Sequence, residues 1–113
     1  MAELSSITAL KALDGLWTRA TVGAENIANA NTPGYRPLQV TFEAALQRAA
    51  AKGKDAVEAV EPKIERDRSP AEASGVRLDL QMATESSTAA RYAALIEILD
   101  RRSQRDEAAL QNG

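Results

Sequence analysis

The chain has 113 residues, room for one domain at most, and its 14 Lys and Arg nearly balance 16 Asp and Glu, for a net charge of −2. Because the two signs are interspersed, a surface that follows nucleic-acid phosphates is not expected. The lack of Cys and His excludes disulfides and thiolate metal sites and removes the commonest general base, so neither a cofactor nor a small-molecule substrate is expected. Alanine supplies much of the 44% hydrophobic content and aromatics only 4%, which favours thin helix-on-helix packing.

The first predicted element is a helix from about residue 3 to residue 30. Its apolar residues recur in alternating steps of three and four, as in a coiled-coil seam. The predicted seam consists of Leu10, Leu13, Trp17, Ala20, Ala24 and Ile27. Gly15 and Gly23 interrupt this pattern, each at a cost of about 1 kcal/mol relative to alanine. They indicate either a weak helix, a close approach by a neighbouring backbone, or a segment that must unfold to pass through a channel.

A turn is predicted where this helix ends, near residues 29–31. Proline cannot continue helical hydrogen bonding, so Thr32 and Pro33 end the pattern. Pro33 and Gly34 suit the two central positions of a type II turn, because proline presets φ and glycine accepts a positive φ. Tyr35 is expected to pack the turned chain back onto its own helix. Asn31 is expected either to cap the helix end or to bond across a subunit boundary.

The middle of the chain shows weaker patterns. Residues 36–40 are predicted to be extended, because Pro37 opposes a helix. Thr41 is expected to cap a short helix over residues 42–51, and Gly53 to end it. Residues 54–75 contain Pro62 and Pro70 and no aromatic residue, which predicts a flexible connection.

The last predicted element is a helix from about residue 79 to residue 110. Alternating Val76, Leu78 and Leu80 before it would by themselves suit a short strand. A second seam steps along the helix through Leu78, Met82, Glu85, Ala89, Tyr92, Ile96 and Leu99. The predicted fold class is therefore all-α, with the two long terminal helices paired antiparallel as in a coiled coil. The chain is predicted to be one structural domain with three parts. Residues 1–35 form the first helix and its turn, residues 36–75 an extended segment, a short helix and a flexible connection, and residues 76–113 the last helix.

No catalytic arrangement stands out. Asp79 and Glu85 fall on different helical faces, and Ser86 and Ser87 have no histidine or evident lysine to activate them. Arg101, Arg102 and Arg105 form a basic cluster, which suits the C-terminal end of a helix or an acidic groove on a neighbouring subunit. These patterns favour a structural role over an enzymatic one.

The run Asn26-Ile27-Ala28-Asn29, followed by Thr32 to Tyr35, resembles the N-terminal signature of the bacterial flagellar rod and hook family. Residues 76–82 and 90–99 are similar to the C-terminal block of its proximal rod members. The resemblance implies that Asn26, Ile27, Asn29 and the turn fix the exit of the first helix. It implies packing against that helix and adjacent subunits for Val76, Leu78, Met82, Arg91, Tyr92 and Leu95.

This resemblance implies a subunit of the proximal rod, a tube around the flagellar export channel. Its implied partners are copies of itself, other rod proteins, the basal-body adaptor, the MS ring and the export gate. Residues 1–17 lack the pattern of a cleaved secretory signal, and no apolar run is long enough to span a membrane. Taken alone, these features indicate a cytoplasmic protein, but the resemblance implies export through the flagellar type III channel to the periplasmic rod. The alternatives are a cytoplasmic helical adaptor or secretion chaperone and, less favoured, a membrane-surface helix over residues 4–17.

Overall fold

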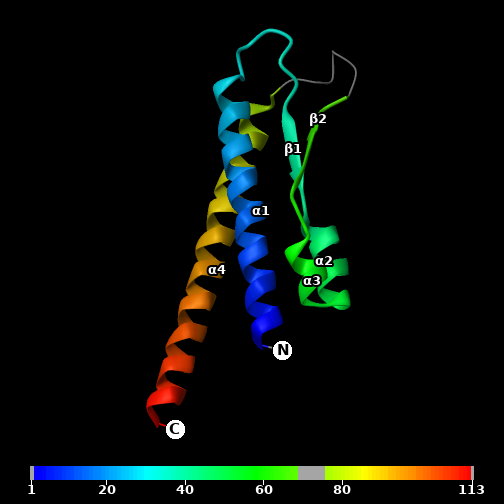
Figure 1. Ribbon diagram of the computed structural model, residues 1–113. Coiled ribbons are helices and arrows are strands. Elements are labelled where there is room, and N and C mark those ends of the chain that lie inside the picture. Colours follow the sequence, from blue (N-terminus) through cyan, green and yellow to red (C-terminus); the bar gives the residue numbers. More distant parts are fainter. Residues whose placement is uncertain (1, 69–75, 113) are drawn as a thin grey trace.

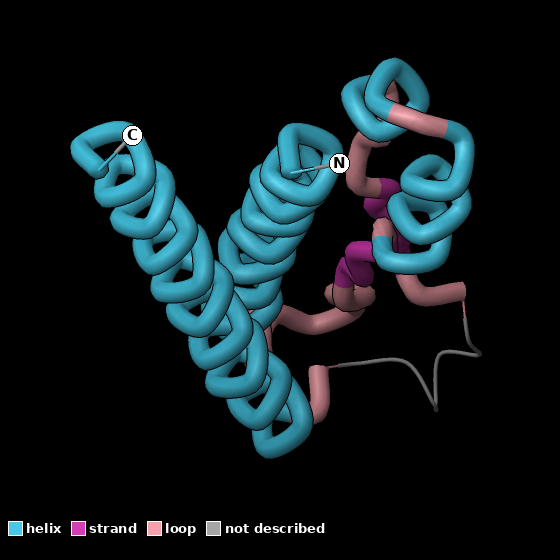
Figure 2. Tube along the Cα trace, turned by 90° about the horizontal axis from the view of Figure 1, so that it is seen from below, coloured by secondary structure: helices cyan, strands magenta, loops and turns pink. Residues whose placement is uncertain are grey.

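The computed structural model describes residues 2–68 and 76–112. In chain order the elements are α1 (Ala2–Ala28), β1 (Leu38–Thr41), α2 (Glu43–Lys52), α3 (Lys54–Glu58), β2 (Lys63–Arg66) and α4 (Leu78–Asn112) (Figure 1). α1 and α4 lie side by side and run antiparallel, while the strands and the two short helices flank α1 on its other side (Figures 1 and 2). The molecule is elongated and thin, with extents of 63 × 26 × 14 Å.

The prediction of a mostly helical chain with two long terminal helices is confirmed, but all-α is not correct, because two strands form a small sheet. β1 and β2 pair antiparallel, in the register Leu38 with Arg66, Gln39 with Glu65, Val40 with Ile64 and Thr41 with Lys63. The flexible connection predicted for residues 54–75 is therefore wrong over α3 and β2. Residues 69–75 of that prediction lie outside the described residues.

The main core lies between α1 and the segment that carries β1, α2 and α3. Its buried residues are Leu16, Val22, Val40, Phe42, Leu46, Ala49 and Val57. Tyr92 and Leu95 of α4 are half-buried against this cluster. The chain thus has a core of its own beside the seam between the two long helices.

The start of α2 differs from the prediction, whereas its end agrees. Thr41 is the last residue of β1 and Phe42 is the N-cap, without a side-chain capping bond. The prediction of Thr41 as the cap is wrong because pairing with Lys63 keeps that residue in the strand. Gly53 ends α2 as predicted, with φ 119° and its N–H donated to the Ala49 carbonyl.

The two helical glycines of α1 make room for neighbouring side chains. A Cβ on Gly15 would lie 2.5 Å from the ring of Phe42, and one on Gly23 would collide with the carboxylate of Glu85 on α4. Close approach of a neighbouring group therefore explains both glycines. The groups that approach are side chains, not the backbone that the sequence analysis considered. Gly15 admits the buried ring that joins α1 to the small sheet, and Gly23 admits α4.

Candidate functional site

The turn after α1 has the predicted geometry. The N–H of Tyr35 donates to the carbonyl of Thr32 at 3.1 Å, and Gly34 has φ 76°. With Pro33 between them, these features define a type II turn. α1 itself ends at Ala28, slightly earlier than predicted.

Asn26 is the centre of the contacts that hold this turn. It is 1% exposed, and its Nδ2 donates to the Leu38 carbonyl at 2.8 Å and to Gln81 Oε1 of α4 at 3.2 Å. Its Oδ1 accepts the Leu38 N–H at 2.9 Å and the Tyr35 hydroxyl at 3.1 Å. One carboxamide therefore joins the end of α1, the turn, the start of β1 and α4.

The other residues of the motif differ in their contacts and in their exposure to solvent. Asn29 donates from Nδ2 to the Glu25 carbonyl at 2.9 Å and accepts the Thr32 hydroxyl at 3.1 Å, which closes the last turn of the helix. Ile27 is half-buried, whereas Asn31 is exposed. The structure thus gives Asn29 a local role and leaves the side chain of Asn31 facing solvent.

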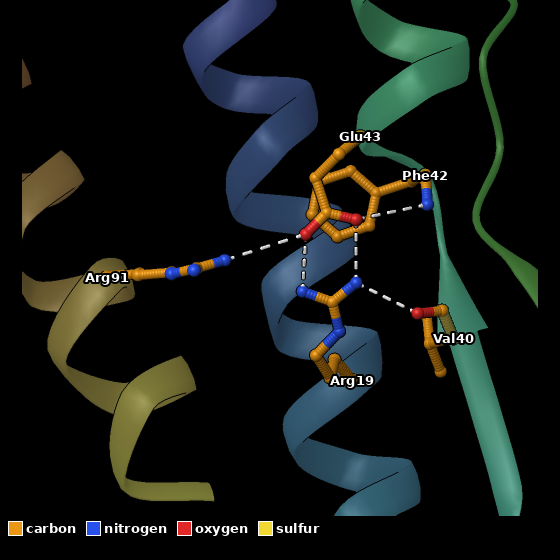
Figure 3. A network of polar contacts seen from close by, with 5 residues as sticks. All are labelled: Arg19, Val40, Phe42, Glu43 and Arg91. Carbon is orange, nitrogen blue, oxygen red and sulfur yellow. Dashed lines mark hydrogen bonds and ion pairs between the residues drawn. The ribbon is translucent and has the colours of Figure 1, made fainter. Parts of the chain in front are cut away.

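A second polar cluster joins α1, α2 and α4 (Figure 3). Both oxygens of the Glu43 carboxylate accept from the Arg19 guanidinium, at 2.6 and 2.7 Å, and Arg19 also donates to the Val40 carbonyl at 2.9 Å. The guanidinium carbon of Arg19 lies 4.9 Å from the centroid of the Phe42 ring. Arg91 of α4 reaches the same carboxylate at 3.7 Å.

This arrangement stabilises the charged form of Glu43. The hydrogen bonds from Arg19 are the main cause that lowers the pKa of Glu43 from 4.5 to about 2, against a smaller opposing effect of burial. Bidentate Arg–carboxylate pairs are among the strongest charge-assisted contacts. From the sequence, Arg91 was named for packing and for a possible intersubunit contact, whereas Arg19 and Glu43 were not named. Nothing local in the sequence shows that the first residue of α2 faces the middle of α1.

Along the two predicted seams, burial differs from one seam residue to the next. Leu13, Ala20, Ile27, Tyr92 and Leu99 are buried or half-buried, as is Glu85. Leu10, Trp17, Ala24, Met82, Ala89 and Ile96 are exposed, and in each case the residue one position earlier is more buried. Leu16 is 3% exposed against 65% for Trp17. Leu78, at the start of α4, is also exposed.

The exposed seam residues other than Leu78 form an apolar face on the α1–α4 pair, which we call the outer face: Leu10, Trp17, Ala24, Met82, Ala89 and Ile96. Each of these residues comes one position after a residue that faces the other helix, and is therefore turned by about 100° around its own helix. Because the two helices run in opposite directions, this turn brings the residues of both helices to the same side of the pair. The rings of Trp17 and Tyr92, 6.3 Å apart, bridge the helices beside this face. The small sheet lies on another side of α1, where Gly15 meets Phe42.

The four arginines predicted as possible intersubunit residues differ in their contacts within the chain. Arg91 contacts Glu43, Arg102 donates to the hydroxyl of Ser6 at 3.1 Å, and Arg101 pairs with Glu97 within α4. Arg105 is exposed in the last turns of α4. Arg91 and Arg102 thus hold α4 against the rest of the chain.

The residues considered for catalysis are not brought together. Asp79 pairs with Arg77, Ser86 and Ser87 are exposed, and Glu85 has one buried carboxylate oxygen without a hydrogen-bond partner. Burial raises the pKa of Glu85. Within residues 2–68 and 76–112, no group of acidic side chains is placed to hold a metal ion. Across the described helices, none combines the length and hydrophobicity needed to cross a membrane.

Part of the chain is similar to a known protein. Over 47 residues the chain is 49% identical to a protein of Borrelia hermsii named flagellar basal body rod protein FlgB. The aligned part covers 42% of this chain and 35% of the relative, so the chain spans about a third of that protein's length. No protein-family model matches the chain. The similarity supports a relation to flagellar rod proteins over the aligned part.

Proposed function

We propose that the chain is a structural subunit of the flagellar basal-body rod, and more specifically of its proximal part. The local identity to a rod protein supports this proposal. The fold is consistent with it, because two antiparallel terminal helices form an elongated subunit. The resemblance of the Asn26 to Tyr35 turn to the axial-protein signature is a further support.

The observation that carries the proposal is the outer face. Leu10 is 53% exposed, Trp17 65% and Met82 56%, although the chain has few large apolar side chains to cover its core. Exposed apolar residues gathered on one face of a helix pair are typical of a protein–protein interface. In the proposed rod, neighbouring subunits cover this face.

Repetition of one contact between different surfaces of identical or related subunits builds a tube. The proposal therefore includes copies of this chain and other rod proteins as neighbours, and the basal-body adaptor, MS ring and export gate at the base. Passage through the flagellar type III channel, without removal of a signal, to a periplasmic position is part of the same proposal. Residues 1–35 and 76–113 would form the axial part, and residues 36–75 the part between them.

The test is the location of a tagged full-length chain in the bacterium that encodes it. We expect the chain in detergent-resistant basal bodies. Trp17→Glu and Met82→Glu should reduce its incorporation strongly, because each places a charge in a covered apolar interface. Gln47→Glu, at an exposed position of α2, is the matched control and should assemble normally. A purely cytosolic pool with a bound client protein would overturn the proposal in favour of an adaptor or chaperone.

A further inference from the structure

Among residues 2–68 and 76–112, no strand pairs with the outer edge of β2. The N–H and carbonyl of Leu38 and the carbonyl of Val40 face α1, where Asn26 and Arg19 bind them. β1 therefore turns its other backbone groups toward β2, as the bond from the Asp67 N–H to the Pro37 carbonyl confirms at 2.9 Å. Because backbone groups alternate along a strand, those of Ile64 point away from β1.

Because one edge of β1 contacts side chains of α1 and its other edge pairs with β2, the outer edge of β2 is the edge of the sheet farther from those contacts. All four residues of β2 are exposed. An exposed edge strand presents unpaired N–H and carbonyl groups that can pair with another strand. The edge of β1, in contrast, is already occupied by side chains of α1.

A hollow with a partly apolar lining lies beside this edge. Ile64 is opposite Val40 in the sheet, so the two side chains share a face, but Val40 is 4% exposed and Ile64 49%. Ile64 borders an open hollow of about 360 Å³, to which Phe42, Val60 and Pro62 contribute apolar lining. The rest of its lining is polar: Lys11, Asp14 and Thr18 of α1, and Glu61. A strand added at β2 would place an apolar side chain against Ile64 and this hollow.

We propose that a second copy of the chain docks here, by antiparallel pairing of the two β2 strands about Ile64. In this register each Ile64 lies opposite its counterpart, and the two residues exchange both backbone hydrogen bonds. Lys63 of each copy then lies opposite Glu65 of the other. Charge complementarity at both pairs selects this register. The next registers that keep outward backbone groups opposite each other are shifted by two residues, and they would place Glu65 opposite Glu65 or Lys63 opposite Lys63 of the other copy.

The geometry leaves room for the two copies. In the four-stranded sheet that results, the two β1 strands lie about 14 Å apart, three strand spacings. A helix with its side chains is about 10–12 Å across, which is less than this separation. The contacts of Asn26 and Arg19 hold each α1 at the edge of its own β1 that is farther from the second copy. In the single chain, Lys63 and Glu65 pair with each other at 3.0 Å and both are exposed, so both side chains are free to turn to the partner.

This contact goes beyond the proposed function and uses residues outside the outer face. Sedimentation equilibrium of the full chain over roughly 10 µM to 1 mM tests it, since a contact this small should be weak. We expect a monomer–dimer equilibrium. Trp17→Glu should leave the dimer unchanged even if it blocks rod assembly, so failure of the rod proposal and failure of the β2 contact are distinguishable.

Exchanging the charges of Lys63 and Glu65 gives the sharpest test of the proposed register. Lys63→Glu and Glu65→Lys should each weaken self-association roughly tenfold, because both cross-strand pairs become like-charged. An equimolar mixture of the two variants should associate again, since both pairs are then of opposite charge. The double variant Lys63→Glu with Glu65→Lys should also associate like the unaltered chain. Loss of the ion pair within one strand would not produce recovery on mixing.

Variants of Ile64 test the backbone hydrogen bonds of the proposed contact. Ile64→Pro removes the outward N–H without removing a bond to β1, and should abolish the dimer. Ile64→Ala keeps the N–H and should retain more of the dimer. Circular dichroism checks that each variant keeps its helices. A chain that stays monomeric throughout, charge variants that dimerise normally, or a mixture that does not recover would each overturn the proposal.

Discussion

The side chain of Asn26 binds both backbone groups of Leu38, with Nδ2 donating to the carbonyl at 2.8 Å and Oδ1 accepting the N–H at 2.9 Å. The carboxamide thus takes the place of a neighbouring strand at the start of β1. An amide offers a donor and an acceptor side by side, which a carboxylate does not. This pairing gives the first Asn of the turn motif a physical role, because it sets where the chain goes after the turn.

Asn26→Asp should destabilise the fold by about 2–4 kcal/mol, because it buries a charge and places an oxygen opposite the Leu38 carbonyl. Urea unfolding followed by circular dichroism measures the change. Asn31→Asp is the matched control at an exposed position and should stay within about 0.5 kcal/mol of the unaltered chain. Equal effects at the two positions would show that Asn26 does not hold the turn.

Gly34 should tolerate side chains in the order Asn, then Ala, then Val. Its φ of 76° is strained for residues with a Cβ and most of all for β-branched ones, at about 1–3 kcal/mol. A Cβ there meets no neighbour within 4 Å, so steric contacts cannot explain a loss. Thermal unfolding of the three variants and swimming of cells that carry them test the order. Normal stability and swimming for Gly34→Val would contradict it.

The two glycines of α1 should respond in opposite ways to alanine. Gly15→Ala should destabilise the chain by about 1–3 kcal/mol, because the new Cβ meets the buried ring of Phe42. Gly23→Ala meets only the end of the flexible Glu85 side chain and the Gln81 amide at 3.3 Å. In a Glu85→Ala background it should therefore stabilise the helix by about 1 kcal/mol. Urea unfolding decides, and shifts of the same sign at both glycines would contradict the packing described.

Acid should weaken the fold in part through Glu43. Its pKa is about 2 in the folded chain against an ordinary 4.5, so its contribution is present above pH 4.5 and is lost as the pH falls toward 2. Because the carboxylate side chain is 49% exposed, we expect only about 1 kcal/mol. Glu43→Gln should remove this part of the pH dependence, whereas Glu107→Gln, exposed on α4, should retain it. An unchanged pH profile in Glu43→Gln would contradict the assignment.

Local signals explain what was predictable from the sequence. Pro33 and Gly34 determine a turn from their own backbone preferences, and the heptad steps were enough for two long helices. The exact seam was harder, because Leu16 and Trp17 are adjacent and both apolar. The prediction assigned the larger side chain, Trp17, to the seam. In the structure Trp17 is exposed and Leu16, one residue earlier, is buried.

Nonlocal contacts explain what was missed. β2 reads Lys-Ile-Glu-Arg and is exposed along its whole length, so it has no buried alternating face to detect. It is specified by pairing with β1, far away in the sequence. The contact of Arg19 with Glu43 likewise exists only once the turn has folded β1 and α2 back along α1.

Leu10 offers the most direct test of the central proposal, that the outer face is covered in the rod. The chain has no cysteine, so Leu10→Cys introduces a single reactive thiol at a position 53% exposed in the free subunit. Maleimide labelling is compared between the purified chain and detergent-washed basal bodies that contain it. We predict rapid labelling of the free chain and strong protection in the basal body. Equal labelling in both, or absence of the chain from basal bodies, would contradict the proposal.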